Sequence, residues 1–139
     1  MTPEKMAKLH SNSEANHRTW DAHEFAEILS SNCVLAECHE HGFALARVIE
    51  SEAELLLLVT DKIKRNTGLA TNCLLKIEKK IVEIGARKLT LEVSESNKTA
   101  IQIYKKLNYI KISVRKSYSR DKNGKLEDAL VMQKDLLLI

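Results

Sequence analysis

Cysteine, glycine, proline and aromatic residues are all scarce in this sequence. Its 139 residues include three cysteines, four glycines, one proline and 4% aromatic residues, so aliphatic side chains must build the core. Cys33, Cys38 and Cys73 are odd in number and lack the C-x-x-C spacing of zinc sites. Reduced thiols in a cytosolic protein are the simplest interpretation. The length predicts a single domain over residues 1–139.

Segments that would direct the chain to a membrane are also lacking. Residues Met1 to His10 are polar and do not form the apolar centre of a signal peptide. The longest apolar run, Leu55 to Val59, is far shorter than the roughly 20 residues that span a bilayer. We therefore expect a cytoplasmic protein with no membrane association. The net charge of +3 does not indicate direct nucleic-acid binding, because a clustered basic face is its usual footprint.

Hydrophobic periodicity predicts a mixed α/β fold. The first half of the chain is expected to form two helices and then an antiparallel meander of three strands, over residues 3–13, 21–30, 33–38, 43–49 and 54–60. The second half is expected to form helix, strand, helix and two strands, over residues 68–84, 88–94, 97–107, 109–118 and 126–138. The unit from Leu55 to Val93 should be a right-handed parallel crossover. The sheet is thus mostly antiparallel with one central parallel pair, flanked by helices, and splaying of that pair could form a ligand cleft.

The segment that indicates function most clearly is Arg65-Asn66-Thr67-Gly68-Leu69-Ala70, between a strand and a helix. The first turn of a helix has unpaired N–H groups and the positive end of the helix dipole. A turn of small residues there lets a phosphate approach the backbone, and the neighbouring Lys62 and Lys64 add positive potential. This chemistry suits a pyrophosphate. The alternative is that Gly68 only permits a tight turn before the helix.

Arg65-x-x-Gly68-x-Ala70 resembles the R/Q-x-x-G-x-G/A pyrophosphate loop of the GNAT acetyltransferases. Other motifs resemble, more narrowly, the bacterial ribosomal-protein alanine N-acetyltransferases, the RimI group. They are collinear over nearly the whole chain and comprise Trp20-Asp21-x-x-x-Phe25, Glu52-Ala53-Glu54-Leu55-Leu56, Leu91-Glu92-Val93-x-x-Ser96-Asn97-x-x-Ala100-x-x-x-Tyr104 and Gly124-x-x-Glu127-Asp128-Ala129. The chain departs from the group because it begins almost at the first helix, so we expect either that the sheet lacks the opening edge strand of the family or that the true N-terminus lies upstream.

The resemblance implies a GNAT fold, acetyl-CoA as cosubstrate, no metal, and direct acetyl transfer without a covalent acetyl-enzyme. It implies that the backbone of Leu58, Val59 and Thr60 binds the acetyl and pantetheine arms. Asn97 would contact the CoA arm, and Tyr118 lies where the family has a tyrosine near the substrate. Tyr118 could equally be an ordinary strand residue. The pyrophosphate would be held by Arg65, Asn66, Thr67, Gly68, Leu69, Ala70 and Thr71.

The resemblance also implies that Glu92 is the general base and Tyr104 the general acid. Their chemistry agrees, because a carboxylate beside the cleft can take a proton from an amine, directly or through one water. A phenol with a pKa near ~10 is protonated at neutral pH and can donate to a departing thiolate. The alternatives are a solvent-facing strand carboxylate and a half-buried packing tyrosine. Asn97 and Tyr104 are seven residues apart, which places them on one helix face.

The acceptor that the resemblance implies is the α-amine of a protein N-terminus, namely an alanine of a small ribosomal subunit protein. Alternatives are a small amine or a lysine side chain as acceptor, or a non-catalytic CoA-binding or partner-binding module. The presence of both Glu92 and Tyr104 argues against the module. Cys38-His39-Glu40-His41 invites a metal hypothesis, but a hairpin turn is favoured because no distant ligands are visible. Cys73 is expected in a helix core rather than as a nucleophile.

Overall fold

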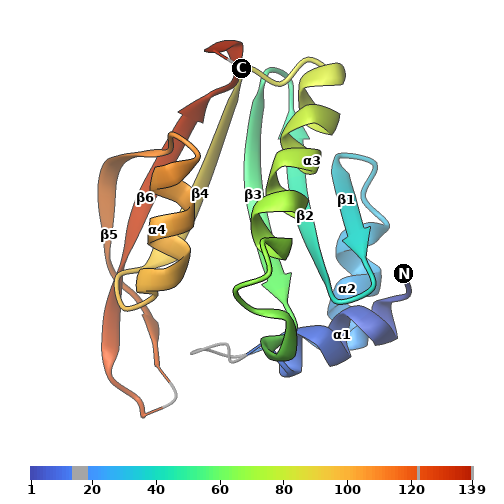
Figure 1. Ribbon diagram of the computed structural model, residues 1–139, viewed down its shortest axis with the longest axis vertical. Helices are drawn as coiled ribbons and strands as arrows, with labels where there is room; N and C mark the ends of the chain where they lie inside the picture. Colours follow the sequence, from blue (N-terminus) through green and yellow to red (C-terminus); the bar gives the residue numbers. More distant parts are fainter. Residues whose placement is uncertain (14–18, 122, 139) are drawn as a thin grey trace.

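The computed structural model describes residues 1–13, 19–121 and 123–138, and it has helices on both faces of one six-stranded sheet (Figure 1). The strands are β1 Val34–His39, β2 Gly42–Ile49, β3 Glu52–Thr60, β4 Lys88–Ser94, β5 Ile110–Arg120 and β6 Leu126–Asp135. The helices are α1 Pro3–Ser11, α2 Ala22–Leu29, α3 Leu69–Glu83 and α4 Lys98–Lys106, with short 3-10 turns η1 Lys62–Lys64 and η2 Leu136–Leu138. The strand order is β1-β2-β3-β4-β6-β5, and β3 and β4 form a parallel pair at its centre. The predicted mixed α/β fold is confirmed.

Local signals in the sequence explain where the helices begin. The hydroxyl of Thr2 accepts a hydrogen bond from the Lys5 N–H (3.1 Å) at the start of α1. Asp21 and Glu24 form a reciprocal capping box at the start of α2. The Asn97 side chain accepts from the Ala100 N–H (3.2 Å) at the start of α4. These caps satisfy N–H groups that have no partner inside the helix.

Two apolar clusters fill the opposite faces of the sheet. One cluster lies between the sheet and the helices α3 and α4. Leu74, Ile77 and Leu89 are at its centre and have no exposed surface. Cys73 is buried in this cluster, as predicted. The other cluster packs α1 and α2 on β1–β3, with Phe25 and Phe43 fully buried and edge to face, 5.6 Å apart between ring centroids. The outer face of β4, β6 and β5 is not covered by a described helix.

The central parallel strands β3 and β4 are paired along only one end of their length. Its register runs from Glu52 opposite Lys88 to Glu54 opposite Thr90 and goes no further. Beyond this point β3 remains paired with β2 as far as Thr60, and β4 remains paired with β6 as far as Ser94. The two strands therefore meet near the top of Figure 1 and separate below it. The second half of β3 keeps one backbone edge without a partner among the described strands.

Three details differ from the sequence-based expectation or were not anticipated. The last strand ends at Asp135 rather than at Leu138, because the chain then turns into η2. Strand β5 continues past Tyr118 to Arg120, which pairs with Leu126 across the hairpin. Gly42 is required by close approach, since a Cβ there would lie 2.6 Å from the Val59 carbonyl oxygen.

The Cys38–His41 segment forms the end of β1 and a tight turn. The Nδ1 of His39 accepts a hydrogen bond from the His41 N–H (3.1 Å). Within residues 1–13, 19–121 and 123–138, no group of three or more His, Cys, Asp or Glu side chains is arranged to hold a metal ion. None of the described helices has the length and apolar character needed to cross a membrane.

Candidate active site

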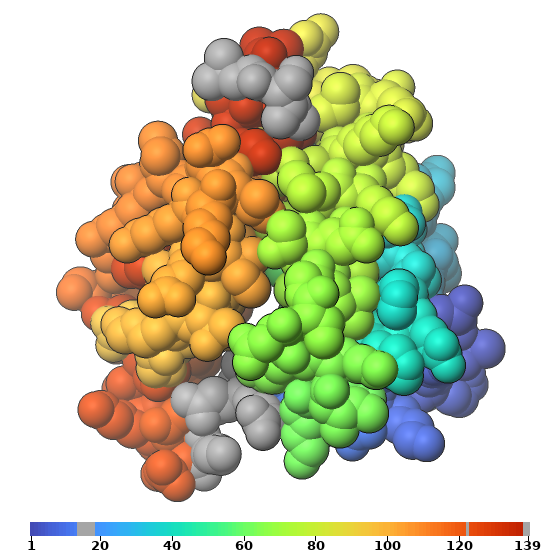
Figure 2. All heavy atoms as spheres, in the orientation of Figure 1, coloured from blue at the N-terminus to red at the C-terminus, as the bar shows by residue number. Residues whose placement is uncertain are grey.

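A cleft of about 850 Å³ occupies the space where β3 and β4 separate. One wall is formed by residues 55–60 of β3 and the loop leading into α3, and the other by residues 91–94 of β4 and by α4. Figure 2 shows the surface hollowed between the orange helix α4 and the green loop at the start of α3. The volume is within the range of roughly 300–1,000 Å³ that is typical of small-molecule and cofactor sites.

The β3 wall offers a line of backbone groups. Leu58, Val59 and Thr60 line the cleft, while the other edge of this strand segment is paired with β2. The side chain of Val59 is buried in the cluster under α1 and α2. The strand is therefore held firmly from one side, and its free edge can form hydrogen bonds with an extended ligand arm.

Helix α3 presents its N-terminus to the same cleft. Gly68 is the N-cap residue, with φ of 81°, in the left-handed region that disfavours side chains. No side chain of the described residues caps this end of the helix. Gly68, Leu69, Ala70 and Thr71 all line the cleft. The uncapped N–H groups and the helix dipole make this end of α3 suited to an anion.

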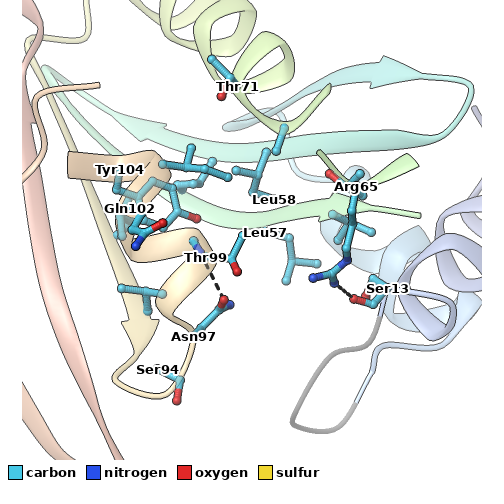
Figure 3. A pocket seen from close by; sticks show the side chains of 18 of the residues that line it. Ser13, Leu57, Leu58, Arg65, Thr71, Ser94, Asn97, Thr99, Gln102 and Tyr104 are labelled. Atoms are coloured by element: carbon cyan, nitrogen blue, oxygen red, sulfur yellow. Dashed lines mark hydrogen bonds between the residues drawn. The ribbon is translucent and has the colours of Figure 1, made fainter. Parts of the chain in front are cut away.

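Two side chains of the predicted phosphate loop, those of Arg65 and Thr67, already form hydrogen bonds to backbone carbonyls of the protein. The Arg65 guanidinium donates to the carbonyl of Ser13, which ties the loop to the end of α1 (Figure 3). Arg65 and Asn66 still line the cleft. Thr67 does not line it, because its hydroxyl turns back to donate to the Lys64 carbonyl (2.6 Å). Thr67 therefore shapes the loop from outside the cleft.

Helix α4 places Asn97 and Tyr104 in the opposite wall, as their spacing predicted (Figure 3). Tyr104 is only 6% exposed, and its ring packs edge-on against Tyr109, 5.7 Å away between centroids. Burial raises the pKa of the Tyr104 hydroxyl above its usual range. The Tyr104 hydroxyl has no hydrogen-bond partner among the described residues. Every fully buried side-chain oxygen of these residues does have a partner, so the Tyr104 hydroxyl is not fully buried. The hydroxyl therefore reaches the cleft as a protonated donor.

Glu92 lies on the outer face of β4 and is held by a cation. Its two carboxylate oxygens accept from the Arg115 guanidinium at 3.3 and 3.0 Å. The same guanidinium lies 5.0 Å from the centroid of the Tyr118 ring. Glu92 and Tyr118 both line the cleft, although they belong to β4 and β5. The structure thus brings an oriented carboxylate and an aromatic ring to the cleft, with Glu92 on the face of β4 opposite the buried Leu91 and Val93.

Apart from Thr67, every residue that the sequence assigned to the site lines this one cleft. Several further lining residues received no role from the sequence. Three of them, Thr99, Gln102 and Lys106, recur at helical spacing along α4 beside Asn97 and Tyr104. This spacing could have indicated from the sequence that they line the same cleft. The others come from α1, the segment before α2, and the end of β4, which have no sequence relation to the loop. The additional polar and aromatic lining residues are His10, Ser13, Trp20, Ser94, Ser96, Thr99, Gln102 and Lys106.

Comparisons with known proteins point to one class. The chain is 27% identical over 135 residues to the [ribosomal protein bS18]-alanine N-acetyltransferase of Escherichia coli K12, covering 94% of this chain and 90% of the relative. The crystal structure of the E. coli ribosomal-protein-S18-alanine N-acetyltransferase superimposes with a TM-score of 0.83 at 24% identity, covering 94% of this chain and 84% of that one. Arabidopsis thaliana NAA60 in complex with acetyl-CoA gives a TM-score of 0.80 at 15% identity, covering 97% and 95%.

The fold, the cleft and these likenesses define a GNAT protein of the N-acetyltransferase class. A family model described as FR47-like protein matches residues 40–118, more than half of the sequence. The chain belongs to this FR47-like family.

Proposed function

We propose that this chain transfers the acetyl group of acetyl-CoA to the α-amine of a protein N-terminus, an alanine of a small ribosomal subunit protein, and that residues 1–139 act as one domain. The observation that carries the proposal is that one cleft is lined both by the N-terminus of α3 and by the pair Glu92 and Tyr104. The alanine acceptor is taken from the E. coli relative, whose name specifies bS18 alanine.

In this proposal the cosubstrate lies along the splayed strands. The start of α3 binds the pyrophosphate through its N–H groups, and the free edge of Leu58–Thr60 binds the pantetheine and acetyl arms. One strand N–H polarises the thioester carbonyl, as an oxyanion donor does. Asn97 contacts the CoA arm with its amide NH₂, since its side-chain oxygen already caps α4. Lys64 and Arg65 add positive potential beside the loop.

The chemical step uses one group on each side of the thioester. Glu92 takes a proton from the acceptor ammonium, directly or through one water. The neutral amine attacks the carbonyl carbon, the C–N bond forms, and the C–S bond breaks. Tyr104 gives its proton to the departing thiolate of CoA, and the second proton, which the nitrogen loses as the amide forms, returns to the Tyr104 oxygen through water. Arg115 orients the Glu92 carboxylate, and Tyr118 packs beside the acceptor.

The phosphate loop is tested by replacing Gly68 with glutamate. We expect the Kd for CoA to rise about tenfold or more, equivalent to about 1.4 kcal/mol, because a carboxylate then faces the phosphates. A Cβ at Gly68 would meet no atom of the described residues within 4 Å, so no clash with them is introduced. Gly85→Glu is the matched control, since Gly85 also has positive φ and open surroundings but lies at the far end of α3. Equal CoA affinity of the two variants by calorimetry would remove the loop from the site.

The acceptor is tested with acetyl-CoA and a panel of amines. A peptide that starts with alanine should be acetylated in preference to the same peptide with a blocked N-terminus and a free lysine. An α-amine has a pKa near ~7.7–8.0, against ~10.4 for lysine, so one carboxylate suffices to deprotonate it. Mass analysis locates the acetylated nitrogen. Faster reaction of the lysine peptide or of spermidine would reject the N-terminal acceptor, and binding of acetyl-CoA without any transfer would indicate a non-catalytic module.

A further inference from the structure

Strand β5 carries a bulge opposite Asp128 of β6. Two ladder pairs, Arg115 with Ala129 and Ser119 with Glu127, flank the bulge. Between them lie three residues of β5 but only one residue of β6, whereas a regular antiparallel pair would have one opposite one. Bulges re-aim side chains and are common next to active sites. This bulge ends at Tyr118, which lines the cleft.

The Asp128 carboxylate holds the bulge with both oxygens. One oxygen accepts from the Ser117 N–H (2.9 Å), and the other accepts from the Lys116 ammonium (3.2 Å). Ser117 has φ of 50°, a left-handed conformation that is unfavourable for a residue with a side chain. The Ser117 N–H and the Lys116 ammonium hold the pKa of the Asp128 carboxyl below its usual range. Asp128 is therefore the local contact that stabilises an otherwise unfavourable backbone.

The bulge decides on which face Tyr118 lies. In a regular strand Arg115 and Tyr118, three residues apart, would point to opposite faces of the sheet. In this structure the Arg115 guanidinium stacks over the Tyr118 ring and also pairs with Glu92. The extra residues of the bulge thus bring Tyr118 to the face that carries Glu92. Asp128 achieves this without lining the cleft itself.

We propose that Asp128 is a positioning residue for the acceptor, which keeps Tyr118 and Arg115 against Glu92 by holding the β5 bulge. The inference rests on the proposed function, because it places the acceptor amine at the Glu92 end of the cleft. It also gives separate structural roles to Glu127 and Asp128, the two acidic residues of the C-terminal motif. Glu127 accepts a short hydrogen bond from the Ser94 hydroxyl (2.5 Å) at the end of β4, while Asp128 holds β5.

Three variants separate the contacts of Asp128. Asp128→Ala removes both, Asp128→Asn keeps an oxygen that can accept from the Ser117 N–H, and Lys116→Met removes only the ion pair. Asp128→Ala is expected to raise the KM for the alanine peptide about tenfold, the effect of one lost charge-assisted hydrogen bond. Its Kd for acetyl-CoA should stay within about twofold of wild type, because β3 and α3 are untouched. Asp128→Asn and Lys116→Met should both remain close to wild type.

The outcomes are distinct. An unchanged peptide KM in Asp128→Ala, or an equal loss of acetyl-CoA affinity, would overturn the positioning role. So would a Lys116→Met variant as impaired as Asp128→Ala, because the exposed ion pair rather than the bulge would then matter. If Asp128→Ala does not fold, Asp128→Glu displaces the carboxylate by one methylene and should show the same rise in KM. If wild type prefers another amine, the proposed acceptor is wrong, and the same variants measured with that amine decide the role of Asp128.

Discussion

Replacing Tyr104 by phenylalanine is expected to lower kcat about 10²–10⁴-fold, the usual contribution of a general acid or base. The ring and its contact with Tyr109 are retained, and the lost hydroxyl leaves no described partner unpaired. The acetyl-CoA affinity and the melting temperature should therefore be unchanged. Because burial raises the pKa of the Tyr104 hydroxyl, its proton stays in place through the neutral and mildly alkaline range, and wild-type kcat should not fall there through loss of this donor.

Tyr109→Phe is the matched control for this experiment. Tyr109 is also buried, but its hydroxyl donates to Glu78 (2.6 Å) and not to the cleft. Its removal should reduce stability modestly and leave kcat within a few-fold of wild type. Glu92→Gln tests the base in the same way and should lower kcat by a similar factor. Near-wild-type single-turnover rates in both Tyr104→Phe and Glu92→Gln would show that the acid and base lie elsewhere.

Replacing Lys134 by methionine is expected to lower the free energy of unfolding by about 3–5 kcal/mol, since it leaves a buried carboxylate without its cation. Glu78 of α3 is 1% exposed and Lys134 of β6 is 6% exposed. The Lys134 ammonium donates to Glu78 at 2.8 Å, and the Tyr109 hydroxyl donates to the other oxygen. This network connects α3 to β6 behind the cleft. Urea denaturation followed by circular dichroism measures the effect.

The compensating variant makes this prediction specific. Changing Glu78 to leucine, Lys134 to methionine and Tyr109 to phenylalanine together removes the charges and the hydroxyl and keeps similar volumes. We expect this triple variant to recover most of the stability, because apolar replacement of a buried ion pair is often neutral or stabilising. If Lys134→Met alone were as stable as wild type to within about 1 kcal/mol, the pair would be shown to contribute little.

Much of the candidate site was predictable because it depends on local sequence. The helix caps in the surrounding fold are of the same local kind. The caps at Thr2 and Asp21 each involve residues three positions apart, so the local sequence alone indicates them. Gly68 is similar, since its positive φ and its place before an amphipathic helix both follow from a few residues. The helix α3 and the following strand were therefore correctly located, and the collinear motifs then suggested the roles that the proposed function gives to the loop before α3.

Long-range contacts decided the rest. No periodicity shows that Lys134 at an inward position of β6 meets Glu78 on α3, because the two residues are 56 positions apart. The pairing of β3 with β4 stops after Glu54, and the cleft exists only because each strand then follows a different neighbour. The β5 bulge likewise depends on Asp128 from the opposite strand. By itself the sequence determined which segments are helices and strands and which side chains are candidates for the chemistry, since these are local properties. The depth of the cleft, the face on which Tyr118 lies and the burial of Glu78 were decided only by tertiary structure, because each is set by packing between elements far apart in the chain.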